Sequence, residues 1–392
     1  MRRCAPDSFQ AGVNGVRIRD IQAIGLTGAT PEGGWSNELR PEDSVHTLVI
    51  VRTDDDLTGL GSVFTNAGLV RAALAILEPL YRGENALEPE RVSEKLHQHT
   101  FWLGRGGSLT HAISGIDIAL WDILGQATGQ PVGRLLGGRY RERVLPYASL
   151  LMDQPAPLAE HLREISARGL RAFKIGWGPF GRVSHQLDEQ IVRAARDAVG
   201  PDAKLMVDAG GSDAYWTNGL KWALRTADML AEYNVDWFEE ALAPDALEDY
   251  VILRRQAPLP ISGGEVLTRR QAFTPFLTAG AFDIVQPDVT KVGGISEERR
   301  IGWMAQEHGV RFIPHGWNTA IGLAADLHLA SAFPATDLVE YIDGSPYVDE
   351  IVADPWQLDE DGMLPIPDVP GLGIRLNLDA VTKYGDAPLT EG

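Results

Sequence analysis

The first third of the chain has a pattern of strands followed by helices. Residues 16–65 contain short apolar runs at 47–52 and 60–64, separated by the turn sequence DDDLTG at 54–59. This pattern predicts a three-stranded meander. Three later segments repeat apolar residues on one helical face, at 67–81, 88–98 and 108–128. Strands and then helices indicate an α+β domain, which we place at residues 1–140.

The rest of the chain alternates short apolar runs with helical segments. Such alternation is typical of βα units and a parallel sheet. A doubly wound sheet would need a glycine fingerprint after its first strand, and PYASLLMD at 146–153 has none. We therefore predict a (β/α)8-type TIM barrel at 141–355, capped by the first domain, with 356–392 packing back on that cap. The expected strands lie near 144–150, 171–177, 203–208, 235–239, 259–264, 282–287, 310–315 and 336–341.

Composition narrows the class of protein. Of 392 residues, 44% are hydrophobic and 23% are charged, which is typical of a globular protein with two domains. No apolar run is long enough to cross a membrane, and the net charge of −19 without a basic cluster argues against nucleic-acid binding. The single cysteine, Cys4, and the lack of a signal-like N-terminus lead us to expect a cytoplasmic protein.

Ionisable residues occur at the ends of seven consecutive expected strands. They are 23 to 34 residues apart, which is about one βα unit each. In a barrel of this kind the active site lies at the carboxyl ends of the strands. An isolated acid after a strand is usually a turn or capping residue. What indicates a site is that all seven residues lie at the same end of successive strands. The residues are Lys174, Asp208, Glu239 or Glu240, Glu265, Asp288, His315 and Glu340.

Converging carboxylates predict a bound cation. Acids that meet in a buried volume repel one another, and a divalent ion removes that penalty. Ligation by oxygen alone suits Mg²⁺ or Mn²⁺ better than Zn²⁺. Side chains alternate along a strand, so we expect only one of Glu239 and Glu240 to face the barrel interior. Alternation does not decide which one.

Two long segments resemble the enolase superfamily, most closely its mandelate racemase subgroup. They are AISGIDIALWDILGQATGQPVGRLLGG at 112–138 and DIVQPDVTKVGGIS at 283–296. The resemblance covers nearly the whole chain. It implies Mg²⁺ ligands at Asp208, Glu239 and Glu265, and so prefers Glu239 to Glu240. It also implies a His315–Asp288 dyad, a lysine base at Lys174 and a glutamate at Glu340 after the eighth strand. We further expect a homo-oligomer.

The chain departs from the family's pattern at two positions. Ala172 stands where relatives often have a lysine that meets the substrate carboxylate, and Gly210 stands where they often have asparagine. Both changes affect substrate contacts. We expect them to open space for a longer polyhydroxylated acid, and to disfavour mandelate as substrate and a two-base racemase as mechanism.

The resemblance implies removal of a proton alpha to a carboxylate, a step that needs its developing charge stabilised. We expect His315 to take the proton while Asp288 orients its imidazole. We expect Glu340 to hydrogen-bond the ene-diolate, either in a protonated form or by sharing a proton. Loss of a β-hydroxyl would then give a 2-keto-3-deoxy acid. The prediction is a hydro-lyase, a dehydratase of an aldonic or aldaric sugar acid.

Other functions stay open at this point. Lys174 and His315 on opposite faces of a small carboxylate substrate would suit a racemase, epimerase or cycloisomerase. A non-catalytic metal-binding relative is the alternative outside enzymes. Lys174 itself could be a second base, the acid for the leaving group, or a partner of the substrate carboxylate.

Substrate contacts are expected from the cap and from the strand ends. The cap loop TPEGGWSNE at 30–38 and the segment VFTNAG at 63–68 are candidates to close the pocket, with the first loop mobile before ligand binds. The alternative is that the first segment is an ordinary surface loop and the second the end of a hairpin. Tryptophan side chains also pack in protein cores more often than they bind ligands. The candidate contacts are Trp35, Asn37, Thr65, Asn66, Trp177, Trp216, Trp317 and Asn318.

Overall fold

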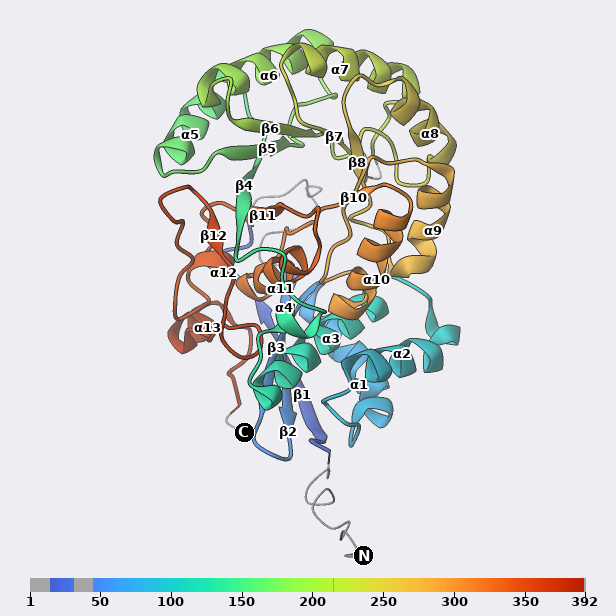
Figure 1. Ribbon diagram of the computed structural model, residues 1–392, viewed down its shortest axis with the longest axis vertical. Coiled ribbons are helices and arrows are strands. Elements are labelled where there is room, and N and C mark those ends of the chain that lie inside the picture. The colour runs from blue at the N-terminus through green and yellow to red at the C-terminus, as the bar shows by residue number, and fades with distance from the viewer. Residues whose placement is uncertain (1–14, 32–44, 214, 391–392) are drawn as a thin grey trace, which may run out of the picture.

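The computed structural model describes residues 15–31, 45–213 and 215–390. The cap contains an antiparallel sheet in the order β1-β2-β3, as the meander pattern predicts. Helices follow the sheet and cover one side of it (Figure 1). The elements are β1 Ile18–Leu26, β2 His46–Thr53, β3 Thr58–Phe64, α1 Ala67–Tyr81, α2 Pro89–His99, the 3-10 turn η1 Phe101–Leu103, α3 Ser108–Thr128 and α4 Val132–Leu135.

Eight parallel strands form the second part of the chain, and all eight lie within or overlap the expected segments. In Figure 1 they form a ring with helices on its outside, which is the predicted TIM-barrel class. The strands are β4 Arg143–Leu151, β5 Ala172–Gly176, β6 Lys204–Asp208, β7 Phe238–Glu239, β8 Ile261–Gly263, β9 Ile284–Val285, β10 Arg311–Phe312 and β11 Leu338–Ile342. The helices are α5 Pro155–Ala167, α6 His185–Val199, α7 Leu220–Glu232, α8 Leu247–Gln256, α9 Arg269–Ala279, α10 Gly294–Glu307, α11 Ala320–Ala332 and α12 Pro346–Asp349.

Strand order follows the chain around the ring. The hydrogen-bonded path runs β10-β9-β8-β7-β6-β5-β4-β11, so its two ends are consecutive strands. At this junction the Thr336 hydroxyl donates to the Phe312 carbonyl at 2.7 Å. Each of these strands therefore points its carboxyl end to the same mouth of the ring.

Helix α11 joins the barrel to the cap. All thirteen of its residues are buried, because it packs on β11 and β4 on one side and on β3 and α4 on the other. Its small alanines allow this close double packing. Helix α10 packs against α3 in the same layer. The cap is thus held over one flank of the barrel, with the end of β3 close to its mouth.

The C-terminal segment contacts both parts of the molecule. Strand β12, Leu364–Pro365, pairs antiparallel with β4 of the barrel. Helix α13, Leu378–Tyr384, lies beside β1, and the Thr27 amide donates to the Tyr384 carbonyl at 2.8 Å. The domain boundaries at 140 and 355 stay predictions. Among the described residues, no helix combines the length and the apolar character that a membrane crossing requires.

Candidate active site

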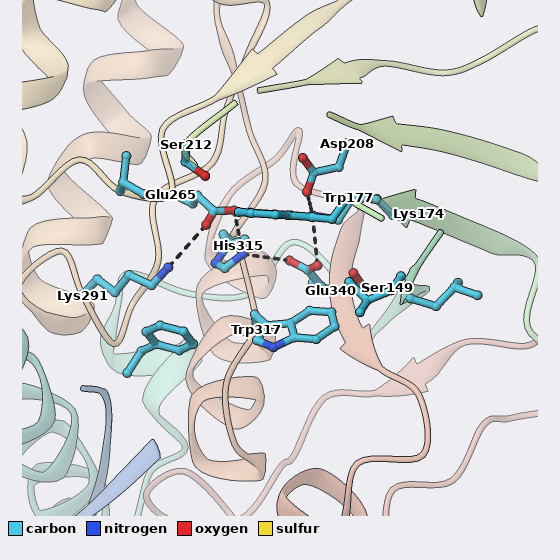
Figure 2. Close-up of a pocket in the computed structure, with 15 residues that line it drawn as sticks. Ser149, Lys174, Trp177, Asp208, Ser212, Glu265, Lys291, His315, Trp317 and Glu340 are labelled. Atoms are coloured by element: carbon cyan, nitrogen blue, oxygen red, sulfur yellow. Dashed lines mark ion pairs between the residues drawn. The ribbon is translucent and has the colours of Figure 1, made fainter. Parts of the chain in front are cut away.

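The seven ionisable positions predicted at the strand ends gather at one mouth of the barrel. Strands β8, β9 and β10 are shorter than expected, so Glu265, Asp288 and His315 lie two or three residues beyond them in loops. Asp288 and His315 nevertheless form a parallel bridge that continues the sheet. Figure 2 shows Lys174, Asp208, Glu265, His315 and Glu340 directed into one space.

Three of these acids form a compact oxygen cage. Asp208, Glu239 and Glu265 each offer a carboxylate oxygen, and these atoms lie within 4.8 Å of one another. All three side chains are buried. Burial raises the pKa of Asp208 to about 8, and the nearby Glu239 carboxylate adds to the effect. A divalent cation would relieve this repulsion, so the donor set fits a hard, oxygen-ligated metal.

The two adjacent glutamates have different partners, and Glu239 is the one that belongs to the cage. Strand β7 ends at Glu239, and Glu240 adopts a left-handed conformation with φ of 45°. The alternation of a regular strand therefore stops before Glu240. Glu240 accepts a hydrogen bond from the Ser212 hydroxyl at 2.6 Å, whereas Glu239 accepts from Trp237 and Gln286 and belongs to the cage.

Lys174 lies among the acids. Its ammonium is 2.6 Å from Glu239, 3.0 Å from Glu340 and 3.7 Å from Asp208. Burial opposes its charge, but Glu239 and Glu340 outweigh burial and raise its pKa well above the usual value. Lys174 therefore acts as a positive charge in this arrangement.

His315 forms the expected dyad with Asp288. Its Nδ1 is 2.8 Å from an Asp288 oxygen, and its Nε2 is 2.9 Å from Glu265. Asp288 is held in turn by the amide of Thr290 at 2.7 Å. Burial disfavours the imidazolium, but Glu265 and Glu340 outweigh it and raise the pKa of His315 well above its usual range.

Glu340 differs from the expectation that crowding would keep it protonated. Burial raises its pKa, but the Lys174 ammonium and His315 outweigh burial, so the pKa lies below the ordinary value. The Gly316 amide donates to it at 2.8 Å. Glu340 is therefore a carboxylate between two cationic side chains.

Lys291 is a site residue that our reading of the sequence missed. Its ammonium is 3.5 Å from both Glu265 and Asp288, and it stands 4.5 Å from the centre of the Phe64 ring. The signal was available, because Lys291 follows Asp288 by three residues inside an otherwise apolar, glycine-containing segment. Phe64 lies at the end of β3, so the cap reaches the site here.

A cavity of about 240 Å³ connects these groups. Its walls include Trp177 and Trp317, both expected substrate contacts, and both rings border the space in Figure 2. Ser149 from β4 and Ser212 from the loop after β6 also line it. A small polar molecule would meet acids, ammonium groups and hydroxyls on one side and indole rings on the other.

The extra substrate space that was expected at Gly210 and Ala172 is occupied by other side chains. Gly210 has φ of +66°, and a Cβ on it would lie 2.5 Å from the Trp177 ring. Trp177 itself has φ of 60°, which directs its ring over the glycine. Ala172 packs with Tyr147 and Met206 in a layer of the barrel core. Neither position enlarges the cavity.

The remaining expected contacts have other partners or positions. Thr65 Oγ1 is 2.9 Å from His111 Nδ1, and Asn66 caps α1 by accepting from the Gly68 amide at 2.8 Å. Trp216 donates to the Ala241 carbonyl at 3.2 Å, and buried Asn318 lies 3.5 Å from Asp326. In the described part of the chain, none of these four lines the cavity. Trp35, Asn37 and most of loop 30–38 lie outside the described residues.

The sequence matches family models over both parts of the fold. Residues 157–380 match the model described as enolase C-terminal domain-like. Residues 41–137 match the N-terminal domain of the mandelate racemase/muconate lactonizing enzymes. The chain belongs to this family of the enolase superfamily.

Similar proteins act on sugar acids and their lactones. A D-galactarolactone cycloisomerase from Agrobacterium fabrum is 35% identical, with 89% of this chain and 93% of that protein aligned. A D-xylonate dehydratase from Haloferax volcanii is 30% identical over 96% of this chain and 90% of its own. The crystal structure of a 3,6-anhydro-D-galactonate cycloisomerase from Zobellia galactanivorans has a TM-score of 0.84 at 28% identity, covering 95% of this chain and 100% of that one.

Proposed function

We propose that this chain is a Mg²⁺-dependent sugar-acid dehydratase that converts an aldonic or aldaric acid to a 2-keto-3-deoxy acid. The observation that carries the proposal is the position of the His315–Asp288 dyad. The imidazole Nε2 lies 2.9 Å from Glu265, at the edge of the acid cage and inside the cavity. A base at this position is suited to a proton beside a carboxylate held at the cage.

Asp208, Glu239 and Glu265 would hold the cation, with Mn²⁺ as the alternative to Mg²⁺. When bound, the cation would polarise the substrate carboxylate as a Lewis acid and so acidify the alpha proton. The Lys291 ammonium, 3.5 Å from Glu265, adds positive charge at the same end of the cavity. Together these groups favour an anionic substrate.

His315 takes the alpha proton in this proposal. A cation at the cage would engage Glu265, the charge that most favours the imidazolium, and would so leave the imidazole neutral and able to act as a base. Asp288 accepts a hydrogen bond at Nδ1, which fixes the imidazole and stabilises its charged form. The β-hydroxyl then leaves with a proton, which His315 can return to the leaving oxygen. One residue thus serves first as base and then as acid, so no second base is required.

Lys174 acts as an electrostatic residue in this scheme. Its ion pairs with Glu239 and Glu340 place a positive charge beside the region where negative charge develops. Glu340 holds that ammonium at 3.0 Å. The pair would therefore support the ene-diolate without exchanging a proton with the substrate.

Cycloisomerisation of a sugar lactone is the second candidate. The observation in its favour is the 35% identity to a D-galactarolactone cycloisomerase. The same dyad can remove a proton alpha to a carboxylate while the lactone carboxyl, rather than hydroxide, leaves the β-carbon. The two reactions share the first step and differ in the leaving group.

The products separate the candidates. The purified protein with Mg²⁺ should be incubated with a library of aldonates, aldarates and their lactones in D₂O. Formation of a 2-keto-3-deoxy acid with loss of water supports the dehydratase. Opening of a lactone substrate without loss of water supports the cycloisomerase, and deuterium incorporation with inversion but no keto product would reject both in favour of an epimerase.

A cytoplasmic location and a homo-oligomeric assembly belong to the same proposal. The single cysteine supports the first. Fractionation of the native host cells and light scattering of the purified protein test the two statements directly.

A further inference from the structure

A second and larger cavity adjoins the site. It measures about 800 Å³ and shares Ser149, Leu150, Leu151 and Trp317 with the first cavity. Its other walls come from the ends of β4 and β11, from α5 and from cap residues 29–31. A substrate whose carboxylate lies at the acid cage would extend past Trp317 into this space.

The two cavities differ in their cationic side chains. Lys174 and Lys291 line the first cavity together with three acids, whereas the described lining of the second contains no lysine or arginine. The second cavity is lined by Asp153 and Asp343 instead. Its one basic side chain, His161, has Nε2 at 3.9 Å from Asp343, so any charge on His161 is matched by that acid.

The Asp343 carboxylate is fixed in position. Its side chain is only 7% exposed, and the Arg168 guanidinium holds it at 2.5 Å. Arg168 is therefore occupied and does not belong to the described lining of the cavity. A second carboxylate entering the cavity would meet the Asp343 carboxylate and would find no lysine or arginine in the described lining, so its loss of hydration would not be compensated.

Carboxylates are the charged groups that a ligand meets in the second cavity. Asp153 and Asp343 both belong to its described lining. Ionised carboxylates only accept hydrogen bonds. Sugar hydroxyls can donate to them, whereas a second carboxylate cannot.

We propose that the second cavity receives the neutral, hydroxylated end of a substrate that carries a single carboxylate. The enzyme then selects aldonic acids, or sugar acids whose far end is closed as a lactone, and rejects aldaric diacids. This inference rests on the proposed function, in which the substrate carboxylate binds at the acid cage. Asp343 is its specificity-determining residue, because a diacid places its second carboxylate beside Asp343 whichever end binds first.

The test compares acids that differ only at the far carbon. Gluconate with glucarate, and galactonate with galactarate, form two matched pairs. Binding to the Mg²⁺-loaded protein is measured by calorimetry, and 2-keto product is measured separately. We expect each monoacid to bind at least about tenfold more tightly than its diacid. Equal binding, tighter binding of the diacids, or no binding of any of the four overturns the inference.

The two readouts keep this inference separate from the proposed function. Tighter binding of monoacids without any 2-keto product rejects the dehydratase and leaves the charge selection standing. Dehydration of diacids at the higher rate rejects the charge selection and leaves the dehydratase standing.

Asp343→Asn tests the residue itself. Removing the charge frees Arg168 to face a second carboxylate, so the preference for the monoacid should narrow about threefold or more. Asp359→Asn is the matched control, because Asp359 also pairs with an arginine, Arg143, at 2.9 Å but lies outside the lining of both cavities. An unchanged preference in Asp343→Asn, or the same narrowing in the control, contradicts the assignment.

Discussion

Two buried polar clusters in this molecule use the same kinds of residue in different ways. At the seam between α3 and α10, the Asp117 carboxylate accepts from the Ser296 amide at 2.9 Å, and the Ser114 hydroxyl accepts from the Gly293 amide at 2.8 Å. Trp121 donates to the Ser296 hydroxyl at 3.0 Å. One acid is surrounded by neutral donors, and burial raises its pKa to about 7.

The cluster at the barrel mouth has an excess of acids. Against Lys174, Lys291 and His315 stand six buried carboxyl groups. The six are Asp208, Glu239, Glu240, Glu265, Asp288 and Glu340. Internal pairing cannot balance this set, whereas the seam holds a single acid beside amide and hydroxyl groups. A balanced buried cluster holds two parts of a fold together, and an unbalanced one is suited to bind a cation and an anionic ligand.

Replacing the base should have the largest effect. His315→Asn keeps a polar side chain but cannot exchange a proton near neutral pH, so turnover should fall by about 10²–10⁴-fold. Circular dichroism and Mg²⁺ binding should be unchanged. His308→Asn, on the exposed end of α10, is the control. Near-normal turnover in His315→Asn would refute the assignment of the base.

Replacing a cage ligand should remove metal binding without unfolding the protein. Asp208→Asn preserves shape but removes one charge, so affinity for Mg²⁺ should fall about 100-fold or more. The rise in melting temperature that Mg²⁺ gives the natural protein should disappear in this variant. Asp202→Asn, exposed just before β6, should keep both properties. Unchanged affinity in Asp208→Asn would place the metal elsewhere.

A change at the seam should show the reverse pattern. Asp117→Ala leaves the Ser296 amide buried without its acceptor, so the free energy of unfolding should fall by about 2–3 kcal/mol. The fall should be the same with and without Mg²⁺, and kcat of the folded fraction should not change. Denaturant titration measures the first quantity. A loss of Mg²⁺ affinity would show that seam and site are coupled.

The pH dependence of metal binding should give the smallest effect when it is compared over a single pH unit. With a pKa of about 8, Asp208 carries a proton in the metal-free protein at neutral pH and must lose it to bind the cation. Affinity for Mg²⁺ should therefore rise by up to about tenfold per pH unit below pH 8 and level off above it. Calorimetry between pH 6 and 9 measures this, and a flat profile would contradict the raised pKa.

The sequence predicted most of the fold because its signals are local. Apolar runs bounded by turns marked all eight barrel strands, and the repeat of one βα unit placed the acids at the same mouth. The backbone at Glu240 could not be predicted, since a left-handed residue at a strand end leaves no periodic trace. Nor did residue spacing indicate the low pKa of Glu340, which depends on cations from two other strands.

Buried polar residues within mostly apolar segments were also difficult to predict from the sequence. Asp117 lies in a helix whose buried residues are mostly apolar, and the apolar periodicity of this helix does not indicate a hydrogen-bond acceptor. Lys291 likewise lies in a segment of mostly buried residues. A charged residue inside a buried run is the general signal for such positions, because burying it is unfavourable unless a partner is present.

The packing of Trp177 over Gly210 makes these two positions dependent on each other in evolution. A relative with asparagine at the second position cannot keep the indole where it lies, because a Cβ there would come within 2.5 Å of the ring. Asparagine at 210 and loss of the tryptophan should each be harmful alone and tolerated together, a strongly non-additive pair. A lineage that changed one of these two positions therefore had to change the other as well. Laboratory selection that accepts one substitution at a time would be blocked by the harmful single variants.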